Sequence, residues 1–446
     1  MNLVGRMQRN VDRHYLPWLI GLALAGWALA SYDFNLLVLT IPNISKTLHL
    51  SAGRVGSLVF FVYAAEFVMA LLAGRVMDAW GRKGVWQYTL VGAAIFTGLT
   101  FFVNSFLWLV VVRCLASAFA QTELAISVTM VTEETPGERR GLLYSVVQGG
   151  WPLGVFLASA IYSLTIGYGW HVVFLFGVLP ILVVIGGRFF LREPERWEHL
   201  QEVREAKSDH DSRKARRLMR RYSIDPETAN ATPVRRLFGE AGPVRRQLVL
   251  LSVVWLFYAA SFTATNVYIT DWLTRSGVWT ATGAAHLLLV AAGVGFGFYV
   301  VGGWLGERSG RREVLIGTAC LVAPLNLAFY FFHPADAWGW LLYVAVYQVT
   351  NGTWSGAGYA YWGESFPTEV RGTAIGWLGG MFALGLLIGA GIWTIVIDAA
   401  GRNVAWLVVA VGLAVGQLLS VFLRHIDPGQ ELEAVDTGSA PESATA

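Results

Sequence analysis

Long apolar runs separated by short polar turns dominate the chain. About twenty residues with few or no ionisable groups recur in five runs: 18–41, 85–103, 172–190, 248–269 and 405–423. A helix rises 1.5 Å per residue, so a run of this length crosses a ~30 Å hydrocarbon layer. The first run is longer than the core of a signal peptide, and we expect it to be retained as a span. The pattern predicts an all-α integral membrane protein.

The same pattern, followed along the whole chain, predicts twelve transmembrane helices in two groups of six. The expected spans are 17–42, 54–77, 84–104, 106–133, 141–166, 170–190, 248–272, 280–305, 312–333, 338–362, 370–398 and 403–424. The predicted organisation is an N-tail at 1–16, a six-helix bundle at 17–190, a linker at 191–247, a second six-helix bundle at 248–424 and a disordered C-tail at 425–446.

Charge changes this picture by giving it an orientation. The chain is 55% hydrophobic and only 14% charged, well below the charged fraction of a typical soluble protein. Of the 33 Lys and Arg residues, 28 fall in the tails and even-numbered loops and four in the opposite loops. Positive charge marks the cytoplasmic side, so both termini are expected to be cytoplasmic in a cell (inner) membrane. The basic linker is better explained as a solvated cytoplasmic loop than as a nucleic-acid site.

Two polar turns occur twice at nearly the same spacing. The first fits G-x-x-x-[D/E]-x-x-G-R-[K/R] and repeats at an offset of 229; its residues are Gly74, Asp78, Gly81, Arg82 and Lys83, then Gly303, Glu307, Gly310, Arg311 and Arg312. The second fits E-x-x-P-x-x-x-R-G and repeats at an offset of 231; its acid and base are Glu133 and Arg140, then Glu364 and Arg371. Two motifs repeating together indicate an internal duplication.

In these motifs the sequence resembles the major facilitator superfamily, and the resemblance extends from Trp18 to Arg424. It implies two six-helix bundles around a central cavity, which opens to each side of the membrane in turn. It also implies that the charged residues of the two motifs form a cytoplasmic gate that closes when the cavity faces outward. One departure is Ala79, which replaces a usual basic residue and removes part of that charge network.

Four ionisable residues lie within predicted spans: Asp33, Glu66, Arg113 and Glu123. Each costs about 2.5–3.5 kcal/mol at the bilayer centre even on a lenient scale, so each needs a reason to be there. A carboxylate near an arginine can gain or lose a proton as a substrate anion takes the arginine. We therefore expect Asp33 and Glu123 to carry protons and Arg113 to bind substrate. A purely structural ion pair is the alternative, and it is the favoured interpretation of Glu66.

Uncharged polar and aromatic residues complete the expected substrate site. They are Tyr32, Gln148, Asn266, Asn351 and Trp354. Cys114 and Cys320 have no metal-ligand spacing, so no metal and no cofactor other than the coupling proton is expected.

These features predict a monomeric secondary transporter in the lipid bilayer, importing a small organic anion with a proton. Tyr32-Asp33-Phe34 and the Arg113–Glu123 spacing resemble the sialate, aromatic-acid and organic-anion proton symporter branches. A sugar porter or a proton-driven exporter remains open within the same superfamily. A non-transporting membrane sensor is the alternative of another class. An enzyme is the least favoured, because no nucleophile–base pair lies near the expected cavity.

Overall fold

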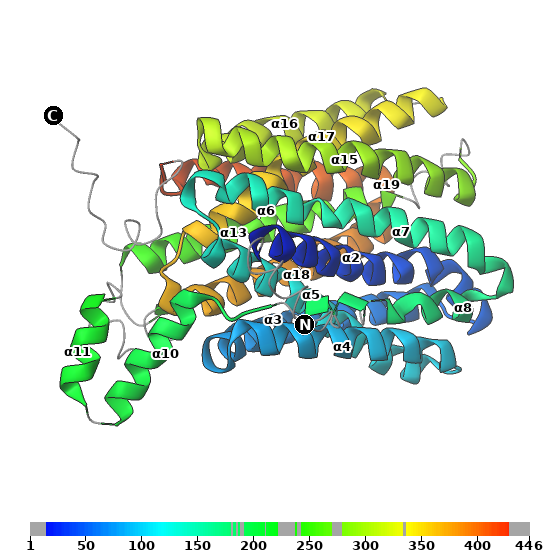
Figure 1. The fold of residues 1–446 in the computed structure, drawn as a ribbon. Helices are drawn as coiled ribbons and strands as arrows, with labels where there is room; N and C mark the ends of the chain where they lie inside the picture. The colour runs from blue at the N-terminus through cyan, green and yellow to red at the C-terminus, as the bar shows by residue number, and fades with distance from the viewer. Residues whose placement is uncertain are drawn as a thin grey trace.

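A computed structural model describes residues 15–179, 182–183, 186–187, 191–209, 211–221, 237–238, 242–269, 279–332 and 336–427. The described chain is helical, and its long helices run side by side (Figure 1). The helices of the first half are α2 (Tyr15–Thr47), α3 (Ala52–Trp80), α4 (Arg82–Leu99), α5 (Phe106–Glu134), α6 (Arg140–Gln148), α7 (Gly150–Thr165) and α8 (Trp170–Leu175).

The linker region holds two short helices, α10 (Glu195–Ser208) and α11 (Ser212–Arg221). The second half contains α13 (Pro243–Phe262), α15 (Ala281–Ser309), α16 (Arg311–Phe332), α17 (Ala337–Glu364), α18 (Thr368–Ala400) and α19 (Arg402–Trp406). A π-helix, η6 (Thr263–Val267), continues α13. Beyond α19 the chain forms η7 (Leu407–Gly412) and η8 (Leu413–Phe422).

Ten helical segments of the described chain are long and apolar enough to cross a membrane. The predicted span at 170–190 is only partly described, and so is the end of the one at 248–272. α17 has the length of a span but is not among the ten. It is rich in Trp, Tyr, Gly and polar residues, and its second half, from Thr350 to Glu364, is buried throughout. The protein interior rather than lipid therefore surrounds that half of α17.

Glycines with positive φ occur at corresponding turns of the two halves. Gly81 (φ 94°) separates α3 from α4, and Gly310 (φ 97°) separates α15 from α16. Gly169 (φ 102°) precedes α8, and Gly401 (φ 84°) precedes α19. Residues with a Cβ rarely adopt this conformation. The glycines of the first repeated motif therefore make the same tight turn in both copies.

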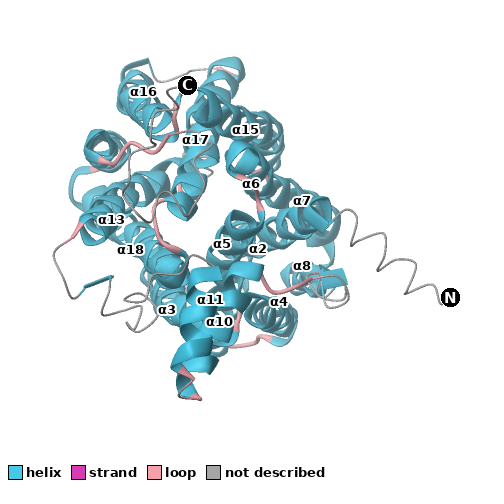
Figure 2. Ribbon diagram, turned by 60° about the vertical axis from the view of Figure 1, so that its left-hand side comes forward, coloured by secondary structure: helices cyan, strands magenta, loops and turns pink. Residues whose placement is uncertain are grey.

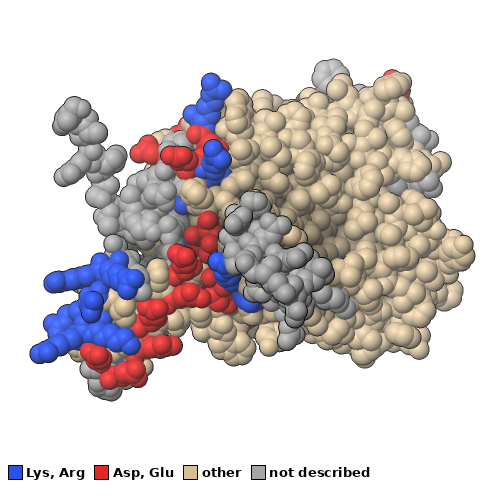
Figure 3. Space-filling view, in the orientation of Figure 1, with Lys and Arg blue, Asp and Glu red and all other residues tan. Residues whose placement is uncertain are grey.

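Charged side chains gather at one end of the helical bundle, which we call the charged end (Figure 3). The middle of the visible face is almost free of Lys, Arg, Asp and Glu, as a lipid-facing belt requires. Helices α10 and α11 project from the charged end (Figure 1). The predicted gate residues belong to the helix termini at this end.

Two sets of helices join the halves. α3 packs along α18, while α15 packs along α6 and α7. Figure 2 turns the charged end towards the reader and shows the helices of both halves surrounding a common centre. α5 and α17 also contact each other and contribute much of the buried interior. The boundary between the halves is therefore formed by α3, α5, α6 and α7 of the first half and α15, α17 and α18 of the second.

Candidate substrate and proton site

Asp33 and Arg113 form a buried ion pair between α2 and α5. Arg113 Nη1 donates to Asp33 Oδ1 at 3.0 Å, and Arg113 Nη2 donates to Oδ2 at 2.9 Å. Thr97 Oγ1 adds a hydrogen bond to Oδ1 at 2.5 Å. The guanidinium also lies over the Phe174 ring, with Arg113 Cζ 5.3 Å from the ring centroid. Two parallel donors to one carboxylate make this a strong, directional pair, which joins two residues 80 positions apart.

A first cavity opens beside Asp33. Its lining residues are Trp27, Ala30, Asp33, Phe34, Glu66, Ser117, Ala120, Gln121 and Trp151. Arg113 is fully buried and is not among them, so Asp33 stands between Arg113 and the cavity. Glu66, which the sequence favoured as a structural residue, lies on the cavity wall with Asp33. Gln121 is a further lining residue, which the sequence pattern did not single out. A polar residue two turns after Arg113 in the same predicted span was the signal that could have identified it.

A second, mainly aromatic cavity lies between the halves. Its lining residues are Trp27, Gln148, Trp151, Tyr258, Phe262, Tyr299, Ser355, Tyr359 and Phe382. Trp27 and Trp151 line both cavities, with ring centroids 5.4 Å apart. The cavity wall contains no formal charge. Gln148 Oε1 is buried and accepts no hydrogen bond from the described residues, while its Nε2 donates to Tyr144. The lining is therefore aromatic, with one buried amide oxygen that is left without a donor among the described residues.

The remaining predicted substrate residues lie away from both cavities. Trp354 is fully buried behind Tyr258, on which it stacks at 5.5 Å between centroids. Asn351 Oδ1 accepts a hydrogen bond from the Tyr258 hydroxyl at 2.6 Å, so it positions a lining residue. Asn266 belongs to η6 and donates to the Tyr347 hydroxyl at 3.2 Å. Tyr32 is buried next to Asp33 on α2, and neither cavity includes it.

Glu123 is buried on α5 but is not brought together with Asp33. Its carboxylate faces Gly26 of α2 and the Trp86 indole of α4. Neither of the two cavities is lined by it. Of the two predicted proton carriers, only Asp33 therefore faces a cavity in this conformation.

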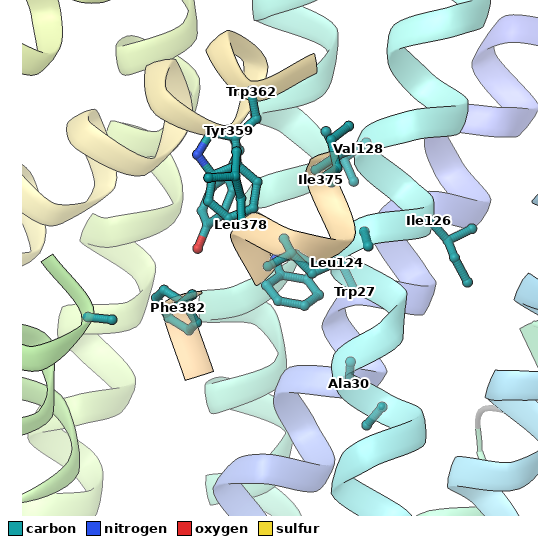
Figure 4. Close-up of a cluster of buried hydrophobic side chains, with 14 of the residues drawn as sticks. Trp27, Ala30, Leu124, Ile126, Val128, Tyr359, Trp362, Ile375, Leu378 and Phe382 are labelled. Carbon is teal, nitrogen blue, oxygen red and sulfur yellow. The ribbon is translucent and has the colours of Figure 1, made fainter. Parts of the chain in front are cut away.

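A hydrophobic layer separates the aromatic cavity from the charged end. Figure 4 shows Trp27, Leu124, Leu378, Tyr359 and Phe382 converging from α2, α5, α17 and α18. Val128, Ile375 and Trp362 lie about one turn further towards the charged end on their helices, and all three are fully buried. Such a layer excludes water from one side of the cavity.

The charged end contains the first of the two predicted gate contacts, made by Asp78 of α3 with α18. Asp78 Oδ2 accepts hydrogen bonds from the Thr373 backbone N–H at 2.8 Å and the Thr373 hydroxyl at 2.5 Å. A Cβ on Gly74 would lie 2.6 Å from the Gly372 carbonyl oxygen, so glycine is required where the two helices meet. Glu133 Oε1 is shared by Arg82 at 3.1 Å and by Arg371 at 3.5 Å. The contacts of Asp78 with Thr373 and of Glu133 with Arg371 join the two halves, and the Arg82–Glu133 pair holds Glu133 in place for its contact.

The second gate contact reproduces the first in the other half. Glu307 Oε1 accepts a hydrogen bond from the Leu142 backbone N–H at 2.7 Å. Leu142 follows Arg140 by two positions, as Thr373 follows Arg371. A Cβ on Gly303 would lie 2.8 Å from the Gly141 carbonyl oxygen. Glu364 Oε1 is shared by Arg311 at 2.8 Å and by Arg140 at 3.6 Å.

Lys83 and Arg312 lie at the edge of this network. The Lys83 backbone N–H donates to Glu193 Oε1 at 3.0 Å, and the Arg82 backbone N–H donates to Glu193 Oε2 at 2.8 Å. Glu193 thus caps the N-terminus of α4, where a negative charge is favourable. Burial raises the pKa of the Glu193 carboxyl, and the backbone donors oppose that shift. Arg312 binds the Val421 carbonyl within its own half.

The sequence matches the family model described as Major Facilitator Superfamily over residues 23–356 and 279–446. The chain belongs to the major facilitator superfamily. It is therefore a multi-pass membrane transporter rather than an enzyme, and the family resemblance of its motifs is confirmed.

The superfamily fold is also shared with solved structures. The proton:xylose symporter XylE, bound to 6-bromo-6-deoxy-D-glucose, superposes with a TM-score of 0.75 at 18% identity, covering 95% of this chain and 99% of that one. The human organic anion transporter MFSD10 superposes with a TM-score of 0.71 at 15% identity, covering 92% and 99%.

Curated relatives within the superfamily include two transporters of Acinetobacter baylyi. The niacin transporter NiaP is 25% identical over 86% of this chain and 88% of its own length. The cis,cis-muconate transport protein is 25% identical over 93% of this chain and 96% of its own length. A putative niacin/nicotinamide transporter NiaP of Bacillus subtilis is 26% identical over 90% and 93%. The alignments run through both halves of this superfamily member.

Proposed function

We propose that this protein imports a small organic anion together with protons by alternating access. In this proposal it has twelve transmembrane helices in two repeats, acts as a monomer in the cell (inner) membrane, and has both termini in the cytoplasm. The observation that carries the proposal is the Asp33 carboxylate, which faces a cavity on one side and the Arg113 guanidinium on the other. The paired positive-φ glycines and the paired gate contacts support the duplication.

Proton coupling follows from the competition for Arg113. When Asp33 is ionised it occupies two guanidinium donors. Protonation of Asp33 weakens that ion pair and leaves the donors to the carboxylate of a substrate. Deprotonation restores the pair and expels the anion. Asp33 thus ties occupancy of Arg113 to the proton, and no other cofactor is required.

The aromatic cavity favours an anion with a flat, unsaturated body. Seven of its nine lining residues are aromatic, and Gln148 supplies a hydrogen-bond acceptor. Relatives whose names refer to niacin and to cis,cis-muconate support the same class. The proposed site therefore holds the substrate body between Trp27, Trp151 and Tyr258, with its carboxylate directed towards Asp33 and Arg113.

The gate at the charged end supports the direction of opening. Asp78 and Glu307 tie the halves together there, and along α5, α17 and α18 the hydrophobic layer lies between the charged end and the aromatic cavity. With that end in the cytoplasm, this conformation is closed to the inside. A substrate would enter from outside and leave after the gate contacts break.

Uptake into proteoliposomes with a pH gradient tests the proposal. The panel contains nicotinate, cis,cis-muconate, benzoate, a saturated monocarboxylate and xylose, each with and without a proton ionophore. We expect ionophore-sensitive accumulation of at least one flat carboxylate and none of xylose. Accumulation of xylose alone would identify a sugar porter, and accumulation only in the opposite direction would identify an exporter.

Trp151 is expected to determine affinity for flat substrates. Its ring contacts Trp27, Phe34 and Phe262 and lines both cavities. Replacing it with alanine removes aromatic contacts of about 0.5–1.5 kcal/mol each, so Trp151→Ala should raise the KM for nicotinate by about 10-fold. Trp108→Ala is the matched control, because Trp108 is exposed at the start of α5, outside both cavities. Equal effects of the two substitutions would contradict this role of Trp151.

A further inference from the structure

A second carboxylate shares the cavity of Asp33. Glu66 comes from α3, is 2% exposed, and lines the cavity with Asp33 and Gln121. Among the described residues, none donates a hydrogen bond to its carboxylate or forms an ion pair with it. Burying a carboxylate without such a partner is costly. A structural role does not account for that cost, because a structural carboxylate would be paired.

The groups that face Glu66 identify its electrostatic partners. They are Asp33 from α2, Arg113 and Cys114 from α5, and Tyr63 one turn earlier on α3, with Tyr268 beyond Tyr63. α18 also packs along α3, and its described ionisable residues, Arg371 and Asp398, lie near its two ends. Arg113 is therefore the one described cation near Glu66, and Asp33 already binds both of its terminal nitrogens.

The formal charge of this cluster decides what it can bind. With Asp33 and Glu66 ionised, the cluster with Arg113 carries a charge of −1 and repels an anion. One proton brings the cluster to zero. Two protons bring it to +1, which matches a single carboxylate. Net charge is strongly disfavoured away from water, so the doubly protonated cluster is the form that accepts a monocarboxylate.

We propose that Glu66 is a second proton-binding residue, so that two protons enter with each monocarboxylate. The inference rests on the proposed function of the same site. From the outer side, one proton binds a Glu66 carboxylate oxygen and another binds Asp33, which releases the donors of Arg113. The substrate carboxylate takes those donors. On the inner side both carboxylic acids give their protons to water as the substrate leaves, and no covalent bond other than O–H is made or broken.

Infrared spectroscopy of the purified full-length protein tests the proton sites without any substrate. Difference spectra between acid and alkaline pH, compared with those of Asp33→Asn and Glu66→Gln, should assign one carboxylic acid band to Asp33 and one to Glu66, apart from the bands of other buried acids such as Glu123. Glu66→Gln should remove one of these bands and leave the band that Asp33→Asn removes. Glu198→Gln is the control, because Glu198 is exposed on α10. A wild-type spectrum from which Glu66→Gln removes no carboxylic acid band would overturn the inference.

 

The number of protons transported with each substrate molecule gives a second, independent test of the inference. With the membrane potential clamped at zero, each coupled proton contributes about 10-fold accumulation per unit of pH difference. We expect about 100-fold accumulation of nicotinate in the wild-type protein and about 10-fold in Glu66→Gln. An inside-negative potential alone should drive uptake in the wild-type protein but not in the variant. Wild-type uptake that does not respond to the membrane potential would overturn the inference. If no acid in the panel is transported, the proposed function is overturned, and the infrared result alone decides whether Glu66 binds a proton.

Discussion

Asp33→Asn is expected to abolish accumulation of substrate against its gradient while leaving exchange across the membrane intact. Asparagine cannot carry the proton or compete as an anion for Arg113, so the guanidinium stays available to substrate on both sides. Glu66 has no bond to Arg113 among the described residues and cannot expel the substrate in place of Asp33. Under a pH difference of one unit, the accumulation ratio should therefore fall from about 100 to about 1.

Counterflow measurements separate this loss of coupling from a loss of folding. Labelled substrate should still exchange with unlabelled substrate inside vesicles containing Asp33→Asn. Thr97→Val is an informative companion, because it removes only the hydrogen bond to Asp33 Oδ1 and should retain proton-driven uptake. Accumulation that persists in Asp33→Asn would show that the coupling proton binds elsewhere.

The sequence was sufficient for those features that depend on local pattern. Apolar runs predicted the long helices, and the repeated motifs predicted which residues meet at the charged end. Gly81 and Gly310 show why this worked: a positive φ leaves few alternatives to glycine. The motifs also carry the family resemblance, which the match to the superfamily confirms.

Side-chain direction within the helices was the part that sequence could not supply. Trp354 and Asn351 lie on the right helix but behind Tyr258, which is the residue that reaches the cavity. Glu66 was assigned to a helix beside the cavity, yet its side chain lines it. A buried span lacks the polar face that fixes the rotation of a surface helix. Which side of α17 or α3 faces the centre therefore depends on packing against helices distant in the sequence.

The two gate contacts are expected to differ in strength, although they repeat in position. Asp78 is 5% exposed and accepts two hydrogen bonds from Thr373 as well as facing Arg82 at 3.4 Å. Glu307 is half-buried, and its Oε1 accepts a hydrogen bond from the Leu142 backbone N–H of α6. Hydrogen bonds to a charged group contribute about 1.5–3 kcal/mol each. Asp78→Asn should consequently shift the equilibrium towards the inward-open state by about 10-fold to 100-fold, and Glu307→Gln by less.

Spin-label distances across the charged end measure this shift. Labels at Trp80→Cys and Ser309→Cys, both exposed positions in opposite halves, report the separation of the halves after Cys114 and Cys320 are replaced by serine. Asp78→Asn should enrich the longer distances more than Glu307→Gln, and neither should alter which acids are transported, because both side chains are remote from the cavity lining. A larger effect of Glu307→Gln would show that the stronger contact lies in the α15–α6 interface. A changed substrate preference in Asp78→Asn would contradict the assignment of Asp78 to the gate.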